Sequence, residues 1–369
     1  MHRHRNNRKS ITHQPLLNIA LRFVGFLKYG ENPRTEAELY ERRGIDHPLS
    51  WRQWKTNGKF GRKVKEAADI SAIAFTDLQA ALRTAIQIRA AFELNFKNSP
   101  CVAVGVKHGN ACGAGVGDTP EQALKRMIEG NPSGLFGALV IATFPIGEVE
   151  ARLLSRYKFP AGKRIIAGVA APHVDTAAYD VLKRTSRPFL TFENAELATL
   201  NRAHLPVIPS RKSLDILDLE IIENPDPYVL DFTDNRIRIR GPADNLGTYY
   251  RDIALADAVC RTSRSNTITI AADGAIWANA VGGQDRVGAC QEALRQYCAP
   301  LRGRAGAVAV SDSFFPFIDG IDALHRGGIY KIFATTGSER DEAVAARVEK
   351  LGITLITLPD KVARGFFGH

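Results

Sequence analysis

The sequence lacks the features that mark secreted, membrane-spanning and zinc-binding proteins. No apolar run approaches the ~20 residues that a transmembrane helix needs, and Met1 to Thr12 contain no apolar core of the kind that a secretory signal requires. The 369 residues include only five cysteines, an odd number, and no CxxC pair or Cys/His cluster has the spacing of a zinc site. We therefore expect a reduced, cytoplasmic protein with no bound metal and no membrane partner.

The positive charge of the chain is not arranged as in nucleic-acid-binding proteins. The formal net charge is +10, yet Lys and Arg are scattered, apart from the N-terminal residues and short groups such as Arg62-Lys63. No basic stripe carries the interleaved aromatic residues that a single-strand binder needs. A basic surface also suits anionic small molecules, and we favour that interpretation over nucleic acid. Residues 1–15 are expected to form a basic, flexible tail, with a transit peptide as the alternative.

The order of apolar runs and amphipathic segments predicts an α/β fold. Hydrophobic residues make up 45% of the chain, which is enough for one large domain or two moderate ones. Residues 205–245 are rich in Pro, Asp and Asn, and we expect them to link a first unit, 16–204, to a second, 246–369. The expected elements are helices over 77–92, after Thr119-Pro120 and over 321–325, strands over 101–106, 307–310, 329–334 and 353–358, and a hairpin about Asp273-Gly274.

Polar residues follow the predicted strand 101–106 directly. Ligand sites in α/β sheets gather beyond the carboxyl ends of strands, which draws attention to Lys107 and His108. A histidine can accept a proton near neutral pH, and a lysine can donate one when burial lowers its pKa. The alternative is a polar strand end that faces water. We interpret residues 107–118 as a loop and its glycines (GxGxG from Gly113) as a flexible turn, because the full dinucleotide spacing is absent.

The segment Phe314–Phe317 (FFPF) places three aromatic rings around a proline after another predicted strand. Such rings could stack on a flat heterocycle, or they could be buried beneath the sheet. The residues alone do not decide between these two interpretations.

Several short motifs occur in a fixed order from residue 27 to the end of the chain. They are Leu27–Pro33 (LKYGENP), Val106–Gly113 (VKHGNACG), Arg264–Asn266 (RSN), Asp312–Asp319 (DSFFPFID), Gly337-Ser338 and Arg364–His369 (RGFFGH). This ordered set resembles the L-R-Y-G-x-N-P, V-K-H-x-x-P-C/A-G, K/Q-S-N, D-A-F-F-P-F-x-D, G-S and R-x-F-x-H motifs of the aminoimidazole carboxamide ribonucleotide (AICAR) transformylases. Each motif is weak alone, whereas the ordered set is specific.

The resemblance implies a fold, a reaction and a partner. The fold would be two cytidine-deaminase-like α/β/α sub-domains that form one transformylase unit. The reaction would move a formyl group from 10-formyltetrahydrofolate, as co-substrate, to the 5-amino group of AICAR in purine biosynthesis. The family's sites form between two protomers, so a homodimer is implied. Only 26 residues precede Leu27, and we therefore expect no cyclohydrolase activity from this chain.

The resemblance also implies roles for individual residues. His108 matches the residue that takes the proton from the attacking amine, Lys107 its catalytic partner, and Asn266 the side chain that orients the formyl group. Positions that match substrate contacts are Lys28, Tyr29, Gly137, Phe314 and Arg364. Positions that match the folate side are Phe136, Arg286, Pro316, Phe317, Asp319 and Ser338.

Departures from the family pattern leave other functions open. Lys28 replaces an arginine, Gly134 a serine, Ala74 an asparagine and Ala167 an acid, and the C-terminal motif has one residue too many. These departures favour, as an alternative, formyl transfer to a related amino-heterocycle. A catalytically idle nucleotide- or folate-binding protein is a further alternative, and the intact catalytic positions argue against it.

Overall fold

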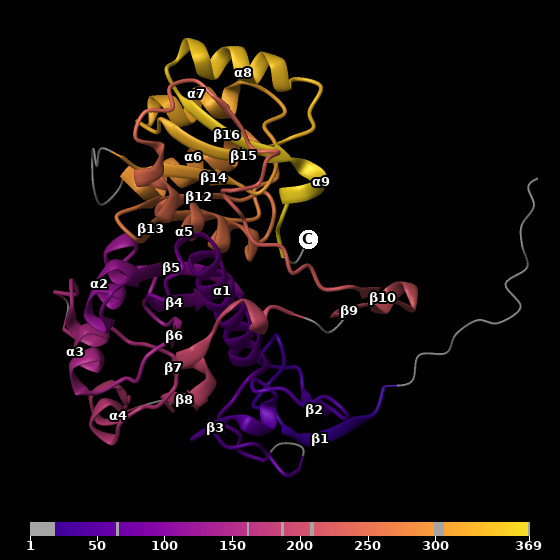
Figure 1. The fold of residues 1–369 in the computed structure, drawn as a ribbon. Helices are drawn as coiled ribbons and strands as arrows, with labels where there is room; N and C mark the ends of the chain where they lie inside the picture. Colours follow the sequence, from indigo (N-terminus) through magenta and orange to yellow (C-terminus); the bar gives the residue numbers. More distant parts are fainter. Residues whose placement is uncertain are drawn as a thin grey trace, which may run out of the picture.

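A mixed β-sheet that runs through the whole molecule dominates the fold (Figure 1). The structure is a computed structural model that describes residues 19–63, 66–160, 162–185, 188–206, 210–298 and 306–367. The expected basic tail, residues 1–15, lies outside the described residues. Within these ranges the large sheet has 12 strands in the order β11-β16-β15-β14-β12-β13-β5-β4-β6-β7-β8-β3. The α/β expectation is therefore confirmed.

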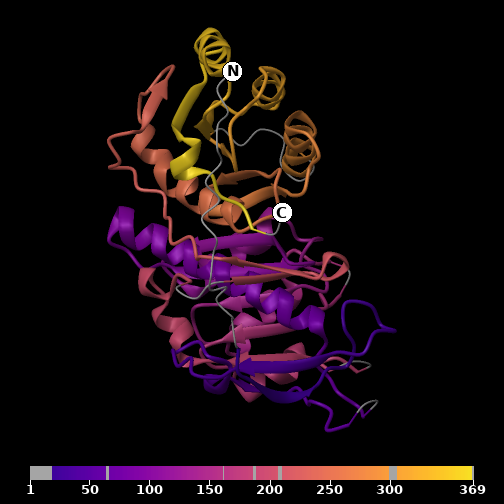
Figure 2. The same cartoon turned by 90° about the vertical axis from the view of Figure 1, so that its right-hand side faces the viewer.

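The sheet is assembled from two halves with the same order of elements, α-β-β-α-β-α-β-α-β. The first half comprises α1 (Ala72–Phe96), β4 (Cys101–Lys107), β5 (Asn110–Gly117), α2 (Pro120–Gly130), β6 (Leu139–Ala142), α3 (Glu148–Arg156), β7 (Gly168–Ala171), α4 (Thr176–Leu182) and β8 (Leu190–Glu193). The second half comprises α5 (Tyr250–Arg261), β12 (Ile268–Ala272), β13 (Ala275–Ala280), α6 (Arg286–Cys298), β14 (Val308–Ser311), α7 (Asp319–Arg326), β15 (Lys331–Thr336), α8 (Asp341–Lys350) and β16 (Thr354–Pro359). Figure 2 shows the second half, in orange and yellow, above the first. The resemblance implies two sub-domains of one fold, whereas the pattern of apolar runs alone did not reveal this repeated order of elements.

Smaller elements complete the halves. Strand β3 (Lys55–Thr56) lies antiparallel beside β8, and β11 (Arg238–Arg240) lies antiparallel beside β16. A separate two-stranded sheet joins β1 (Leu21–Phe26) to β2 (Glu38–Arg42). The remaining short elements are η1 (Trp51–Gln53), η2 (Ala195–Thr199), η3 (Arg202–His204), η5 (Leu246–Tyr249) and α9 (Asp360–Ala363).

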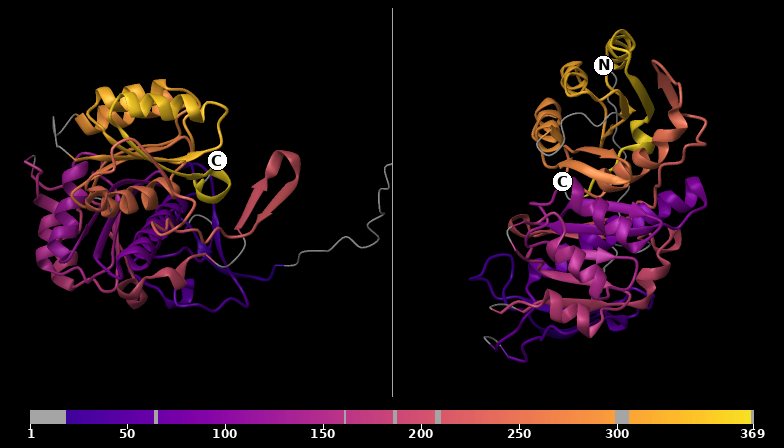
Figure 3. Two further views of the ribbon diagram at one scale, coloured as in Figure 1. Left: turned by 45° about the horizontal axis from the view of Figure 1, so that its top comes forward. Right: turned by 90° about the vertical axis from the view of Figure 1, so that its left-hand side faces the viewer.

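A two-stranded hairpin projects from the body, as Figures 1 and 3 show. It consists of β9 (Ser210–Leu214), η4 (Asp215–Leu217) and β10 (Leu219–Glu223), and we call it the arm. Within the segment 205–245, which the sequence suggested as a linker, the described residues thus form the arm and the edge strand β11.

Strand directions place many loops at one edge of the sheet. β4 is antiparallel to β5, β5 to β13, β13 to β12 and β12 to β14, whereas β14, β15 and β16 are parallel. It follows that β4, β13, β14, β15 and β16 all end at the same edge, which we call the site edge. The parallel strands β6, β7 and β8 run the other way and end at the opposite edge.

Helices cover both faces of the sheet. One apolar core contains residues of α1 and α5 and of strands from both halves, and so it joins the halves across one face. On the other face, α2, α3 and α4 pack on the first half, and α6, α7 and α8 pack on the second. No helix in the described part of the chain has both the length and the apolar character to span a bilayer.

Several sequence predictions are confirmed at the level of elements. The Thr119 side chain caps α2 by accepting a hydrogen bond from the Gln122 N–H at 3.3 Å, and Pro120 occupies the first helical position. The hairpin about Asp273-Gly274 joins β12 to β13, and both turn residues have positive φ.

The interpretation of residues 107–118 as a loop is wrong, because most of them form strand β5. The glycines at 113, 115 and 117 do not make a flexible turn; they let α2 pack directly on the strand. A Cβ atom at Gly113 would lie 2.9 Å from the Met127 carbonyl oxygen, and one at Gly115 would overlap the backbone of Ala123 and Met127.

Candidate functional site

The site edge brings together the segments that the sequence singled out. β4 ends at Lys107 and His108 follows it, the 312–319 segment follows β14, and Gly337-Ser338 follows β15. The 264–266 loop precedes β12, which runs away from the site edge, and therefore lies there as well. Phe136 and Gly137 precede β6, whose first residue, Leu139, pairs with Val106. Candidate site residues from both halves of the molecule therefore lie at one edge of the sheet.

Lys107 and His108 lie at the tight turn between β4 and β5. His108 and Gly109 have φ values of 54° and 73°, as a two-residue hairpin turn with matched twist requires. The buried Asp77 carboxylate of α1 accepts a hydrogen bond from the Gly109 N–H at 2.8 Å. The His108 side chain is exposed and Lys107 is half-buried. Asp77 therefore holds the backbone of the turn, while the side chains of Lys107 and His108 remain accessible to solvent.

Asn110 connects this turn to the second half. Its Oδ1 accepts a hydrogen bond from the Arg264 N–H at 3.2 Å, and its Nδ2 donates to the His108 carbonyl oxygen at 3.1 Å. The loop that carries Asn266 is thus a direct neighbour of the turn that carries His108.

The amide of Asn266 has a defined orientation. Arg286 donates to its Oδ1 at 2.8 Å, and its Nδ2 donates to the Gly283 carbonyl oxygen at 2.8 Å. Arg286 also pairs with the fully buried Asp312 carboxylate and donates to Ser311 Oγ at 3.0 Å. Because a guanidinium can only donate, the Asn266 oxygen must face Arg286, and one N–H of the amide has no acceptor among the residues that the structure describes.

The loop after β14 and the end of β15 contact one carboxylate. Asp360 Oδ1 accepts from Ser313 Oγ at 2.9 Å and from Thr335 Oγ1 at 2.6 Å, and its other oxygen lies 3.4 Å from Arg364 Nη1. Phe314, Ser338 and Arg364, which the resemblance assigns to ligands, are neighbours of these residues in the chain. The Asp360 carboxylate therefore links the loop after β14, the end of β15 and Arg364.

The other expected ligand residues differ in exposure. Phe317 and Phe136 are 59% and 45% exposed, and Phe136 stacks on Phe159 with ring centroids 6.2 Å apart. In the FFPF segment Phe315 is buried, whereas Phe314 and Pro316 are half-buried and Asp319 is exposed. Phe315 thus agrees with the buried interpretation, whereas stacking of the exposed Phe317 ring on a heterocycle stays a prediction.

Lys28 and Tyr29 pack against the start of α1. The Lys28 N–H donates to the Ile70 carbonyl oxygen at 2.8 Å, and the Tyr29 carbonyl oxygen accepts from the Ala72 N–H at 3.0 Å. The Lys28 side chain is exposed. Gly137 has φ 77° and its N–H donates to the Ile165 carbonyl oxygen at 2.7 Å.

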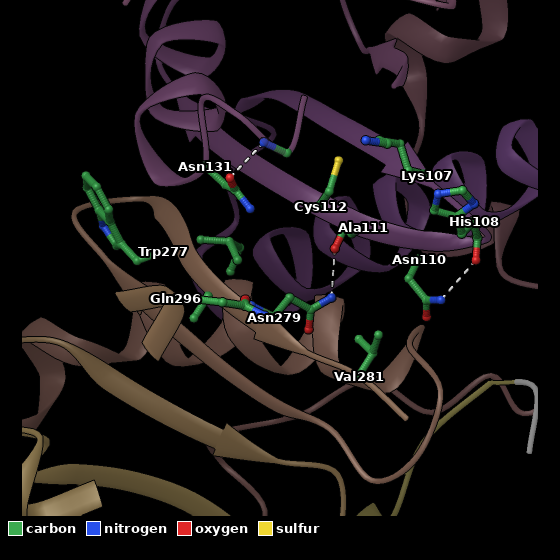
Figure 4. Close-up of a pocket in the computed structure, with 13 residues that line it drawn as sticks. Lys107, His108, Asn110, Ala111, Cys112, Asn131, Trp277, Asn279, Val281 and Gln296 are labelled. Atoms are coloured by element: carbon green, nitrogen blue, oxygen red, sulfur yellow. Dashed lines mark hydrogen bonds between the residues drawn. The ribbon is translucent and has the colours of Figure 1, made fainter. Parts of the chain in front are cut away.

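Two cavities adjoin these residues. A cavity of about 280 Å³ lies between the halves and is lined by Lys107, His108, Asn110, Cys112 and Asn279, among others (Figure 4). A larger cleft of about 1530 Å³ lies beside Arg264 and Ser265 and is bordered by the arm and by Phe366 and Phe367. Six Lys or Arg line the larger cleft against three acids (Arg42, Arg83, Arg211, Lys212, Arg261 and Arg264 against Glu41, Glu223 and Asp226).

Burial perturbs two titratable groups near the turn. Burial raises the pKa of the Asp77 carboxyl, against the opposing effects of the Gly109 N–H and the charges of His108 and Lys107. Burial raises the pKa of the Cys112 thiol to about 12, so this thiol is protonated at neutral pH. In the ranges described above, no group of three or more His, Cys, Asp or Glu side chains could hold a metal ion.

Asp77, Asn110 and Asn279 were missed by sequence reasoning. Asp77 has a counterpart in the second half, where Asp252 accepts from the Gly274 N–H at 2.8 Å and the Asp273 N–H at 3.0 Å. Recognition of the duplicated element order is the signal that could have identified this pair of aspartates.

The fold and the site define an internally duplicated α/β protein whose candidate site residues share one edge of a continuous sheet. Residues 3–296 match the sequence model of the family described as AICARFT/IMPCHase bienzyme, and the chain belongs to this family.

Known relatives are longer than this chain. Over 331 residues the chain is 28% identical to the bifunctional purine biosynthesis protein PurH of Prochlorococcus marinus (strain NATL2A), covering 89% of this chain and 58% of the relative. Over 336 residues it is 31% identical to PurH of Mycobacterium ulcerans (strain Agy99), covering 89% and 56%. The chain thus spans less than three fifths of the length of these relatives.

Proposed function

We propose that this chain transfers a formyl group from 10-formyltetrahydrofolate to the 5-amino group of AICAR, a step of purine biosynthesis in the cytoplasm. The observation that carries the proposal is the hydrogen bond from the Arg264 N–H to Asn110. It makes neighbours of the Lys107-His108 turn and the Asn266 loop, which come from different halves of the molecule. These are the three residues that the resemblance assigns to catalysis.

The proposed reaction breaks one carbon–nitrogen bond and forms another. The amine nitrogen attacks the formyl carbon, and the neutral His108 imidazole accepts the proton that this nitrogen loses. The bond from the formyl carbon to N10 of the folate then breaks, and Lys107 supplies the proton that N10 takes up. The aminoimidazole amine is a poor nucleophile, so its position beside the formyl carbon contributes much of the rate.

Asn266 is suited to the charge that develops on the formyl oxygen. Its free amide N–H is a donor held in place before the reaction, and such preorganised donors stabilise an oxyanion in the transition state. Arg286 contributes by orienting this amide, since its terminal nitrogens are bonded to Asn266, Ser311 and Asp312. We propose that Arg286 borders the folate as well.

The cationic surroundings suit anionic substrates. We propose that Lys28 and Arg364 bind the 5′-phosphate, with Tyr29, Gly137 and Phe314 as further substrate contacts. We propose that the exposed rings of Phe136 and Phe317, together with Pro316, Asp319 and Ser338, contact the folate. The excess of cations along the large cleft supports anionic ligands, and we propose small molecules rather than nucleic acid.

The two halves share one strand arrangement. If the hairpin strands of each half are numbered one and two, both halves have the order 2-1-3-4-5 in the sheet. This arrangement supports two cytidine-deaminase-like α/β/α sub-domains, which we propose for residues 16–204 and 246–369.

We further propose a homodimer whose sites form between protomers. The arm supports this proposal because five large apolar side chains on it are exposed: Ile216 at 93%, Leu217 at 65%, Leu219 at 57%, Ile222 at 46% and Ile221 at 45%. A contiguous exposed apolar surface marks an interaction site, and an isolated hairpin of two strands is marginally stable in water. A second copy of the chain is the partner that the resemblance implies.

The test is a steady-state assay of the purified chain with 10-formyltetrahydrofolate and AICAR, in which the formylated nucleotide and tetrahydrofolate are separated and quantified. His108→Ala and Lys107→Ala should each lower kcat by about 100-fold or more, since loss of a general acid or base costs that much. His173→Ala, which removes an exposed histidine at the opposite edge, is the matched control. Near wild-type kcat in either site variant would contradict the assigned roles.

A second candidate acceptor has one observation in its favour. Ala74 and Ala167 stand where the resemblance expects an Asn and an acid, and neither methyl group can form a hydrogen bond. If the acceptor is a related amino-heterocycle, a panel of aminoimidazoles should include a compound with a higher kcat/KM than AICAR.

A further inference from the structure

The two halves meet along β5 and β13, and these strands separate toward the site edge. Regular backbone pairing is confined to the far end, where Ala275 lies opposite Gly115 and the Val116 N–H donates to the Gly274 carbonyl oxygen at 2.9 Å. Toward the site edge the cavity of about 280 Å³ opens between the strands. Backbone pairing of these two strands therefore does not hold the halves together next to the catalytic turn.

One side chain bridges the open end of this seam. Asn279, on β13, donates through Nδ2 to the Ala111 carbonyl oxygen of β5 at 2.9 Å (Figure 4). The same nitrogen lies 3.1 Å from Ser263 Oγ, and Oδ1 accepts from Thr269 Oγ1 at 2.8 Å. The Asn279 amide is thus fixed on the second half while it binds the first.

The residue next to Ala111 makes the reciprocal contact. Asn110 belongs to the first half, accepts from the Arg264 N–H of the second half, and donates to the His108 carbonyl oxygen. Arg264 is in turn tied to the end of β13, because its carbonyl oxygen accepts from the Gly282 N–H at 2.9 Å. Asn110 and Ala111, adjacent residues of β5, are therefore both bound to the second half. Asn110 is bound through its own side-chain amide, and the Ala111 carbonyl oxygen is bound by Asn279.

We propose that Asn110 and Asn279 are positioning residues that hold the Lys107-His108 turn against the 264–266 loop. They set the spacing between the imidazole that accepts the proton and the amide that binds the formyl oxygen. This inference rests on the proposed formyl transfer, and it adds two residues to which the resemblance gives no role. A displacement of about 1 Å between groups that act on one substrate can lower the rate by roughly 100-fold.

The experiment compares Asn110→Ala and Asn279→Ala with Asn95→Ala in the full chain. Asn95 is a matched control at the far end of α1, because it donates to the Leu230 carbonyl oxygen at 2.7 Å and accepts from the Phe232 N–H at 2.9 Å. All three substitutions remove an amide that ties one segment to a distant one. For each variant we would measure kcat, both KM values and Tm.

The two site variants should lower kcat by about 10- to 100-fold and leave both KM values within about threefold of wild type. Asn95→Ala should lower Tm to a similar extent and change kcat less than about twofold. The double variant should lose less than the product of the single losses, because both residues act on the same seam. Values of kcat in the site variants no lower than in Asn95→Ala would overturn the proposal, and so would an effect on KM alone.

Failure of the proposed function can be told apart from failure of this inference. If the wild-type chain transfers no formyl group, the proposed function is wrong, and amide hydrogen exchange then tests the seam. The Arg264 and Gly282 N–H groups should exchange at least about tenfold faster in both site variants than in wild type or Asn95→Ala. Unchanged exchange at both positions would show that neither asparagine holds the seam.

Discussion

At the scale of single residues, Asp77 combines a useful hydrogen bond with an unfavourable charge. Its Oδ1 anchors the Gly109 N–H, yet burial raises its pKa. A folded-state pKa above the unfolded value of about 3.9 means that the folded protein binds the extra proton more tightly. The contribution of Asp77 to stability is therefore full at low pH and is lost as the pH rises through the folded pKa.

We predict that Asp77→Asn raises Tm at pH 7, because the amide keeps an oxygen for the Gly109 N–H and carries no charge to desolvate. The difference in Tm from wild type should shrink as the pH is lowered toward and below the unfolded pKa of about 3.9, because the raised pKa of the folded state favours uptake of the proton. Calorimetry across this pH range is the measurement. A lower Tm in the variant at pH 7 would mean that the attraction of Asp77 to Lys107 and His108 outweighs its burial.

Ala74 and Ala167 give a second prediction at this scale. Ala74 packs against the shared core at the start of α1, and Ala167 lies just before β7 with its carbonyl oxygen bonded to Arg184. If the proposed function holds, Asn at 74 and Asp at 167 should lower the KM for AICAR by about tenfold, since one gained polar contact contributes about 1–3 kcal/mol. The value of kcat should change less. A KM that stays constant or rises would indicate a different natural acceptor.

The residues of the site could be predicted only in part. Lys107 and His108 follow an apolar strand, which is visible in the sequence. Asn279 could not be found in this way, because its partner Ala111 is 168 residues away and nothing local distinguishes a bridging asparagine from an exposed one. The orientation of Asn266 likewise depends on Arg286, which only the folded chain brings near.

At the scale of elements, the glycines of β5 determine how closely α2 approaches the sheet. We predict that Gly115→Ala lowers the free energy of unfolding by about 1–3 kcal/mol, the usual cost of overpacking, because the added methyl group would overlap the α2 backbone. Urea denaturation followed by circular dichroism is the measurement. Gly247→Ala is the control, since a Cβ at Gly247 meets no atom within 4 Å.

An equal effect of both substitutions would mean that α2 can move away from β5 without cost. In that case the glycines would reflect a requirement of the backbone rather than of packing. The conformation of Gly115 argues against this alternative, because its φ is not in the left-handed region.

Elements with local signals were predicted well. The Thr119-Pro120 helix start and the Asp273-Gly274 turn each depend on residues that are adjacent in the chain. Strand β5 was misjudged because its glycines suggest flexibility, whereas their reason lies in a helix that packs on them. Only the resemblance implied the duplication; the residue pattern did not reveal it, because it is expressed in the order of elements rather than in repeated residues.

At the scale of the whole molecule, the arm should decide the oligomeric state. We predict that Leu219→Glu combined with Ile221→Glu converts a dimer into a monomer, since two charges would then lie in an apolar interface. Multi-angle light scattering is the measurement. Formyl transfer should be lost together with the dimer, because the proposed sites form between protomers.

Val149→Glu is the matched control for the arm, because Val149 lies on α3 and is 63% exposed. This variant should keep both the oligomeric state and the activity. A dimer that survives the double substitution on the arm would assign the interface to another surface, and an active monomer would remove the need for a partner at the site.

The hairpin turns of the two halves offer a comparison within a single chain. His108-Gly109 and Asp273-Gly274 have nearly the same φ values, and in each turn a helix carboxylate receives the glycine N–H. The two turns share one geometry, and only the 107–110 turn has Lys107 and His108. If equivalent substitutions change stability equally at both turns, that effect reports on the demands of folding. An effect that appears only at the 107–110 turn reports on the demands of the proposed reaction.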